Sequence, residues 1–256
     1  MNKLYRYIAL ATLLFTGCSE YTADVEYADN IDERIISFVS FNEIHPSAPN
    51  CVSVIWDSET GDGAIGFDEA ITTIPYGIFT GAQGLTYVWL PDGTTSINDN
   101  AFDSCENLKS IIIPYKVTYI GDGAFSNCHQ LTSVIIPNKV TQIRPYTFYF
   151  CDHLCGIKIG DHVVKIGDWA FAGCSSLTSV TIPDSVTEIG LETFSDCSSL
   201  TSVYCKATTP PAGGNNMFYG NASNRKIYVP MESVNKYKSA SGWSSYASAI
   251  VGYNFK

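Results

Sequence analysis

Apolar residues recur through the middle of the chain with a constant step of 23 in the numbering. Several positions of the repeat keep this step, and each holds one residue type. The phenylalanines are Phe79, Phe102, Phe125, Phe148, Phe171 and Phe194, and the cysteines are Cys105, Cys128, Cys151, Cys174 and Cys197. Leucine and isoleucine recur in the same way, from Leu85 to Leu200 and from Ile74 to Ile189. Such a period is typical of stacked repeats, so we expect a repeat architecture.

Each repeat opens with an alternation of apolar and small polar residues. In the unit that starts at Leu177, Val180 and Ile182 are apolar, whereas Ser179 and Thr181 are polar. Alternation with period two predicts a half-buried strand. Proline cannot donate a backbone hydrogen bond, and we expect it to end this strand in four repeats, at Pro91, Pro114, Pro137 and Pro183.

The second half of each repeat returns the chain to the start of the next strand. We expect Val186 and Ile189 to point inward from the opposite wall, and Gly190 to permit the bend that follows. One unit cannot bury its apolar face alone, so the units stack and equivalent strands form a parallel sheet. The predicted strands are eight, centred near residues 65, 88, 111, 134, 157, 180, 203 and 227.

The N-terminal end of such a stack needs a cover, because it would otherwise expose apolar core and unpaired backbone. Residues 33–62 predict a β cap, with strands over 35–41 and 52–56. The repeats then occupy residues 63–206, and we expect the strand around Ile65 to be their first member.

The C-terminal end, residues 207–256, is expected to hold the last strand and a second cap. The strand at Ile227 and Val229 fits the repeat after a slip of one position. After Pro230, the segment Met231–Ser239 predicts a short helix. Its expected apolar contacts are Val234, Tyr237 and Trp243.

From Gly63 to the C-terminus the chain resembles the BspA-like leucine-rich repeat surface proteins of anaerobic commensal bacteria. The resemblance rests on Ala124–Cys128, on Ala170–Cys174 and on the tail that begins at Ile227–Pro230. It implies a leucine-rich repeat solenoid, right-handed and β-rich, with a parallel sheet, an N-terminal β cap and a C-terminal helical cap. It also implies exposure at the cell surface.

The first residues have the pattern of a targeting segment, which is not part of the folded domain. Lys3 and Arg6 precede a short apolar run, and small residues precede Cys18, as in the lipobox of bacterial lipoproteins. We therefore expect a signal peptide over residues 1–17, a lipid on Cys18 and a flexible leader over 18–32. The expected location is the outer membrane or cell surface, with membrane contact through the lipid only. The alternative is a plain secreted protein.

Charge and composition narrow the function further. The chain has 45% hydrophobic and 16% charged residues, which excludes a disordered protein, and a formal net charge of −10. Such a charge repels phosphate-rich partners, so nucleic acid is not an expected ligand.

The cysteines that recur once in every repeat predict a ladder of buried, reduced thiols. A constant step supplies none of the close cysteine pairs that zinc sites use. Disulfides between neighbours are the alternative, although five members leave one unpaired. Cys128 and His129 could form a nucleophile pair, but the cysteine is expected to be buried.

Two further motifs carry little chemistry. Gly61–Gly66 matches the letters of a dinucleotide-binding loop, but it leads into a strand rather than a helix. Asp57, Glu59 and Asp62 could chelate calcium, but their spacing departs from the EF-hand pattern, and a solvated turn is the favoured interpretation. We therefore expect no cofactor, no metal and no enzyme.

The outward side chains of the parallel sheet are the candidate binding site. Large groups align in adjacent strands, and exposed apolar patches of this kind mark interaction sites. The candidate residues are Tyr87, Trp89, Ile112, Ile135, Lys158, Tyr204 and Tyr228. The leading hypothesis is a protein partner, such as host extracellular matrix, and the alternative is a glycan stacked on the aromatic rings. A third interpretation is that these side chains only favour strands and are covered.

One repeat departs from the others. The unit Asn138–Gly160 has Arg144 where other units have glycine, and Thr147 where they have alanine. Function and sequence drift both remain open as explanations of this irregularity.

Overall fold

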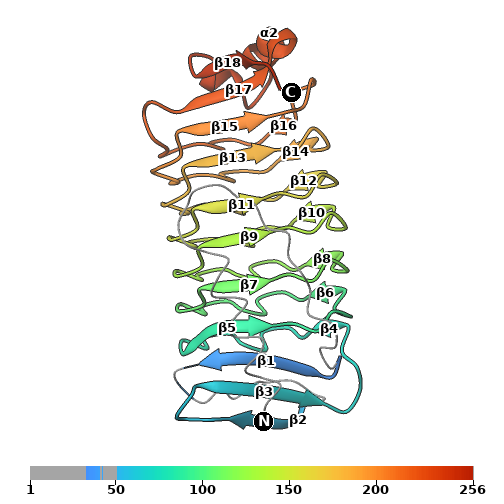
Figure 1. The fold of residues 1–256 in the computed structure, drawn as a ribbon. Coiled ribbons are helices and arrows are strands. Elements are labelled where there is room, and N and C mark those ends of the chain that lie inside the picture. The colour runs from blue at the N-terminus through green and yellow to red at the C-terminus, as the bar shows by residue number, and fades with distance from the viewer. Residues whose placement is uncertain (1–32, 41, 43–50, 256) are drawn as a thin grey trace.

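The computed structural model describes residues 33–40, 42 and 51–255. These residues form one elongated stack of coils, in which each coil places one strand on a long wall and one short strand on the opposite wall (Figure 1). The expected β-solenoid is confirmed, because strands one repeat apart are paired in parallel register.

The long wall consists of eight parallel strands that follow one another along the stack (Figure 1). They are β5 (Leu85–Trp89), β7 (Ser110–Ile112), β9 (Ser133–Ile135), β11 (Gly156–Lys158), β13 (Ser179–Ile182), β15 (Ser202–Cys205), β17 (Lys226–Pro230) and β18 (Ile250–Tyr253). Val88 pairs with Ile111, which lies one full repeat later, whereas Val203 pairs with Ile227, which lies one position beyond a full repeat. The predicted slip before the last repeat strand is therefore confirmed.

The opposite wall is built from strands of only two residues each. They are β4 (Thr73–Ile74), β6 (Ser96–Ile97), β8 (Tyr119–Ile120), β10 (Gln142–Ile143), β12 (Lys165–Ile166), β14 (Glu188–Ile189) and β16 (Ala212–Gly213). The isoleucine of each is buried, as predicted, up to Ile189. The recurring isoleucine therefore closes the core from this side.

The N-terminal cap differs from the prediction in its strand order. It consists of β1 (Ile35–Ser40), β2 (Cys51–Trp56) and β3 (Asp62–Phe67). The strand around Ile65 is not the neighbour of β5, because β1 lies between them and pairs antiparallel with both. The prediction of a first parallel strand near residue 65 is therefore wrong. Alternation shows which face of a strand is buried, but it does not identify the strand's partner.

The C-terminal cap contains the predicted helix. A 3₁₀ turn, η1 (Met231–Ser233), leads into α2 (Val234–Ser239), and a second turn, η2 (Ser244–Tyr246), follows. The rings of Tyr237 and Trp243 are fully buried and meet edge to face at 4.9 Å. The cap then returns the chain to the long wall as β18, which pairs in parallel with β17 and which the sequence did not predict.

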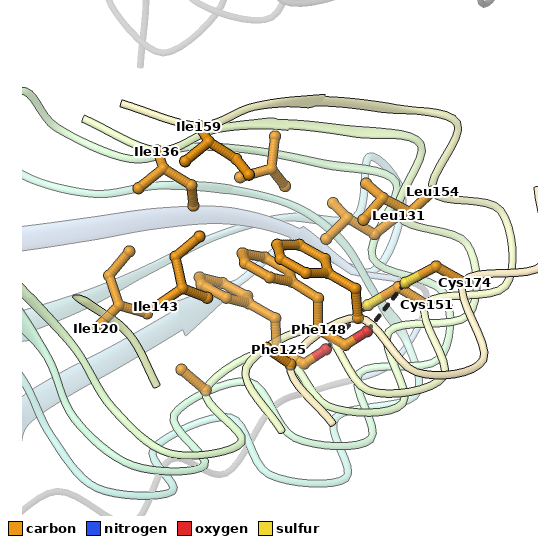
Figure 2. Close-up of a cluster of buried hydrophobic side chains, with 14 of the residues drawn as sticks. Ile120, Phe125, Leu131, Ile136, Ile143, Phe148, Cys151, Leu154, Ile159 and Cys174 are labelled. Carbon is orange, nitrogen blue, oxygen red and sulfur yellow. Dashed lines mark hydrogen bonds between the residues drawn. The ribbon is translucent and has the colours of Figure 1, made fainter. Parts of the chain in front are cut away.

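The core is organised around the phenylalanines of the repeat. Successive rings from Phe79 to Phe194 stack with centroids 5.1–5.4 Å apart, and Phe218 extends the stack at 5.7 Å. Their planes lie within 13° of one another. Figure 2 shows this stacking at Phe125 and Phe148. Stacked aromatic pairs contribute about 0.5–1.5 kcal/mol beyond the burial of their area. The ladder therefore binds each repeat to the next.

The cysteine ladder lies beside the phenylalanines. Its five members are buried free thiols, as predicted. Each thiol donates a hydrogen bond to the carbonyl oxygen of the phenylalanine in the preceding coil, with S···O distances of 3.1–3.3 Å. Figure 2 shows the bonds of Cys151 and Cys174. The cysteine therefore fills a small space and satisfies a buried carbonyl of that coil.

Candidate functional site

The outward side chains of the long wall form a surface that we call the open sheet face. The strand register places Trp89 opposite Ile112, and Ile135 opposite Lys158. Because β7 and β9 are neighbours in the stack (Figure 1), these four residues follow one another in a single row. The row predicted from the sequence is thus present in the fold.

The N-terminal part of this row is apolar. The rings of Tyr87 and Trp89 lie 6.3 Å apart, with planes 25° from parallel. Both rings are partly exposed, as are Ile112 and Ile135 on the next strands. Adjacent, partly exposed apolar side chains on one face of a sheet form the kind of surface that marks interaction sites.

The middle of the open sheet face is polar. Lys158 on β11 and Thr181 on β13 are exposed and interrupt the apolar row. The charged side chain lies between the aromatic residues of the two ends, so any partner that spans the face meets apolar, cationic and again aromatic groups in turn.

The C-terminal part of the row is a cluster of tyrosines. The rings of Tyr204 and Tyr228 stack at 4.7 Å, and Tyr253 stands edge to face with each of them at 5.5 Å. Tyr253 is 42% exposed. Sequence reasoning missed it because β18 was not predicted. The short run of β-branched and aromatic residues in Ile250–Tyr253, after the cap, is the signal that could have found it.

The N-terminal edge of the open sheet face does not continue as the sequence suggested. A first parallel strand around Ile65 would place Gly66, which lies one repeat before Trp89, at the start of the row. Gly66 pairs instead with Ile35, and Ser37 lies opposite Trp89. The cap strand β1 thus supplies the next side chains of the face. Its outward residue beside Tyr87 is Val39.

The candidate nucleophile pair does not fit catalysis. Cys128 is fully buried and donates to the carbonyl of Phe102, and burial raises the pKa of its thiol well above the ordinary value. His129 instead lies 2.8 Å from a carboxylate oxygen of Asp152. A nucleophilic cysteine needs a lowered pKa and access to substrate, and this thiol has neither.

The acidic and glycine-rich loop near the N-terminal cap is a turn followed by a strand. The carboxylate of Asp57 accepts the backbone N–H of Glu59 at 2.8 Å, which closes the turn. The segment Gly61–Gly66 runs into β3 rather than into a helix N-terminus. The geometry of this loop therefore fits the solvated turn rather than a phosphate-binding loop.

The lipid-attachment candidate Cys18, the signal peptide 1–17 and the leader 18–32 lie outside the described residues. Within the part of the chain that the structure describes, no helix is both long and apolar enough to cross a bilayer.

Several solved structures are similar to this chain. A leucine-rich repeat protein of T. pallidum is 29% identical, with 56% of this chain and 68% of that chain covered and a TM-score of 0.49. One from Bacteroides ovatus is 21% identical, with coverages of 79% and 71% and a TM-score of 0.40. A leucine-rich cell surface protein of Faecalibacterium prausnitzii is 19% identical, with coverages of 73% and 76% and a TM-score of 0.36.

No curated protein matches the chain. The family model for the BspA type leucine-rich repeat region matches it in six copies, over residues 63–177 and 141–242. These matches span the phenylalanine and cysteine ladders and both walls of the solenoid. The chain therefore belongs to the BspA-type leucine-rich repeat family.

Proposed function

We propose that this protein is a surface-anchored binding protein whose open sheet face engages a protein partner. The single observation that carries the proposal is the row of large, partly exposed side chains that begins at Trp89 and ends in the tyrosine cluster around Tyr228. Aromatic residues are the usual anchors of protein interfaces, because they bury a large area at a small entropic cost.

Membership of the family supports a place at the cell surface, where BspA-type repeats are common, and such a solenoid is typically a binding scaffold rather than an enzyme. A protein at the cell surface is exposed to proteins of the host extracellular matrix, which are therefore the proposed partners. The net negative charge of the chain repels phosphate groups and therefore disfavours binding to nucleic acid. The cationic Lys158, in the middle of the face, offers a partner carboxylate an ion pair.

The test is adhesion of the purified chain to matrix proteins after substitution of the row. We expect Trp89→Ser combined with Ile135→Ser to weaken binding at least tenfold, because each change removes an apolar contact of the interface. The matched control is Val164→Ser, which removes an apolar side chain of 44% exposure from beside the opposite wall. Equal binding by all three proteins would remove the open sheet face from the proposal.

A glycan is the second candidate partner, and the tyrosine cluster favours it. Tyr204, Tyr228 and Tyr253 combine ring surface with hydroxyl groups at one end of the sheet. A glycan array probed with wild type and with Tyr228→Ala distinguishes the two: signals that disappear in the variant support a glycan, whereas an array without signal argues against it.

The anchor is tested separately at Cys18. We propose that the mature chain begins at this cysteine and carries lipid there, as its lipobox-like context suggests. Incorporation of labelled palmitate by cells that express the wild type, and its loss in Cys18→Ala, is the expected result. Retained label in the variant would exclude Cys18 as the site.

A further inference from the structure

Two turn positions of every repeat have a left-handed backbone. At the first position φ lies between 50° and 60°, and its residues are Gly77, Asn100, Gly123, Tyr146, Trp169, Glu192 and Asn216. At the second, φ lies between 52° and 78°, and its residues are Gly81, Ser104, Asn127, Phe150, Gly173, Asp196 and Gly220. Glycine and asparagine suit this backbone, whereas bulky residues are strained in it.

Three aromatic residues nevertheless occupy these positions, and they belong to two consecutive repeats. They are Tyr146, Phe150 and Trp169, in or just after the unit that departs most from the repeat pattern. Strained residues persist where surrounding structure holds them, and they concentrate at functional sites. The departure of this unit from the repeat pattern therefore coincides with strained backbone of the kind found at ligand sites.

The aromatic side chains form a fixed group, which we call the aromatic corner: Tyr146, Tyr149, Phe150 and Trp169. The rings of Tyr146 and Trp169 stack at 5.2 Å, with planes 7° apart. Tyr149 is nearly perpendicular to Tyr146, at 5.5 Å and 84°, and also to Phe150, at 4.5 Å and 86°. Tyr146 is 40% exposed and Phe150 41%. The corner is thus held by ring contacts and open to solvent.

The stacked pair of Tyr146 and Trp169 has a hydrogen bond at the Trp169 end and a glycine at the Tyr146 end. The indole N–H of Trp169 donates to a carboxylate oxygen of Glu192 at 3.0 Å, which fixes the ring. On the other side of Tyr146, the same turn position holds Gly123, whose backbone N–H donates to the carbonyl of Pro145. Gly123 lies one repeat before Tyr146 and has no side chain, so it does not extend the stack of rings beyond Tyr146.

The charges around the corner are mainly negative. Burial raises the pKa of the Tyr146 hydroxyl, and Tyr149 and then Asp168 add to this rise. Glu192 contacts Trp169, and Asp122 is on the preceding turn, where it pairs with Arg144. Arg144 balances the charge of Asp122, whereas Asp168 and Glu192 accept hydrogen bonds from neutral groups, the Leu191 backbone N–H and the Trp169 indole. The corner therefore keeps a net negative charge, which favours a cation.

The same wall already contains an arginine bound in this way. The guanidinium of Arg144 lies 5.3 Å from the ring centroid of Tyr119 and pairs with Asp122. An aromatic face and a carboxylate together suit the planar, weakly hydrated guanidinium. The following coils supply rings at Tyr146 and Trp169 and carboxylates at Asp168 and Glu192, although at another position of the repeat, because the equivalent of Tyr119 is Gln142.

We propose that the aromatic corner binds an arginine side chain of a polypeptide partner, stacked on the ring face of Tyr146 that Trp169 does not cover, where the net negative charge of the corner attracts the guanidinium. This site is on the turns after the short wall, away from the open sheet face, and it does not rest on the function proposed above. Arginine is favoured over lysine because its planar guanidinium stacks on a ring face.

The test measures binding of fluorescent hexa-arginine by anisotropy, with hexa-lysine and hexa-citrulline as matched probes. We expect Tyr146→Asn to weaken hexa-arginine binding about tenfold, since it removes the stacking ring at unchanged charge. Tyr146→Phe retains the ring and should retain the affinity. Hexa-citrulline, without charge, should bind poorly to every protein.

The control is Trp89→Ser on the open sheet face, which should leave hexa-arginine binding unchanged while it weakens adhesion. Asparagine occupies the equivalent left-handed position at Asn100, so Tyr146→Asn is expected to fold. Equal affinity of wild type and Tyr146→Asn for hexa-arginine would overturn the proposal. So would a glycan array on which a neutral sugar, rather than the peptide, loses binding in this variant.

Discussion

Residue identity is constant at the inner positions of the repeats and varies at the outer positions. The inner position at Phe148 is phenylalanine in six successive repeats, and its rings overlap without interruption. The outer row of the long wall changes from Trp89 to Ile112 and then to Lys158 over the same repeats. Packing against the neighbouring coil constrains the inner side chain, because its volume must match the space. The outer side chains are free of this constraint, so their identity can vary from one repeat to the next.

Phe148 and Phe150 show the difference within one turn. The first is completely buried in the ladder, whereas the second is 41% exposed and lies over Gly173. Two residues of the same type, separated by one position, therefore have different roles. The inner ring holds the repeats together, and the outer ring belongs to the aromatic corner.

The largest expected effect comes from breaking the ladder. Phe148→Ala should lower the free energy of unfolding by about 3–5 kcal/mol, because it removes a buried ring and its contacts with two neighbours. Phe150→Asn, with a residue suited to the left-handed backbone, should change it by less than about 1 kcal/mol. Chemical denaturation measures both. Similar losses for the two variants would contradict the distinction between inner and outer rings.

The thiol ladder should make the core sensitive to alkali. Burial raises the pKa of Cys197 to about 12 from an ordinary value of 9.0. The folded state therefore keeps a proton that the unfolded state releases, so the contribution of this thiol is present below pH 9 and is lost progressively toward pH 12. The loss is about 1.4 kcal/mol per pH unit.

The measurement compares urea unfolding of wild type and Cys197→Ala at pH 8 and pH 10. The variant should be less stable at pH 8, because it lacks the thiol's hydrogen bond to the carbonyl of Phe171. The difference should shrink by about 1.4 kcal/mol at pH 10. A constant difference would show that this thiol does not titrate differently in the two states.

The strain at the aromatic corner predicts a smaller effect. Tyr146→Asn loses a ring stack with Trp169 but gains a residue that tolerates φ of 59°. These terms are of opposite sign and similar size, so stability should change by less than about 1 kcal/mol. Tyr146→Ala loses the stack without the same relief and should be less stable than Tyr146→Asn. Thermal unfolding of the two variants makes the comparison.

The smallest effect on stability is expected from the outer row. Trp89→Ser should alter the free energy of unfolding by less than about 1 kcal/mol, since the ring is outside the core, while it weakens adhesion. Calorimetry together with the adhesion assay tests this separation. A large loss of stability would mean that Trp89 supports the fold. The adhesion of Trp89→Ser would then be interpreted only by comparison with that of the control Val164→Ser.

Much of the site followed from the repeat. Once the register is known, Trp89 and Ile112 must lie side by side on the same face, because the step that aligns the inner phenylalanines also aligns the outer residues. The aromatic corner did not follow in this way. The stacking of Tyr146 on Trp169 and the positive φ of both residues depend on the conformation of the turns, which the repeat pattern does not give.

The amino-acid sequence by itself determined the period, the inner residues and the helix after Pro230, because each coil packs against the next at a constant separation along the chain. Tertiary structure alone decided that β1 lies between β3 and β5, and that β18 extends the long wall beyond β17. These pairings join segments that do not repeat. A strand's alternation records which side it buries, and the choice of partner depends on which free edge the rest of the folded chain leaves beside it.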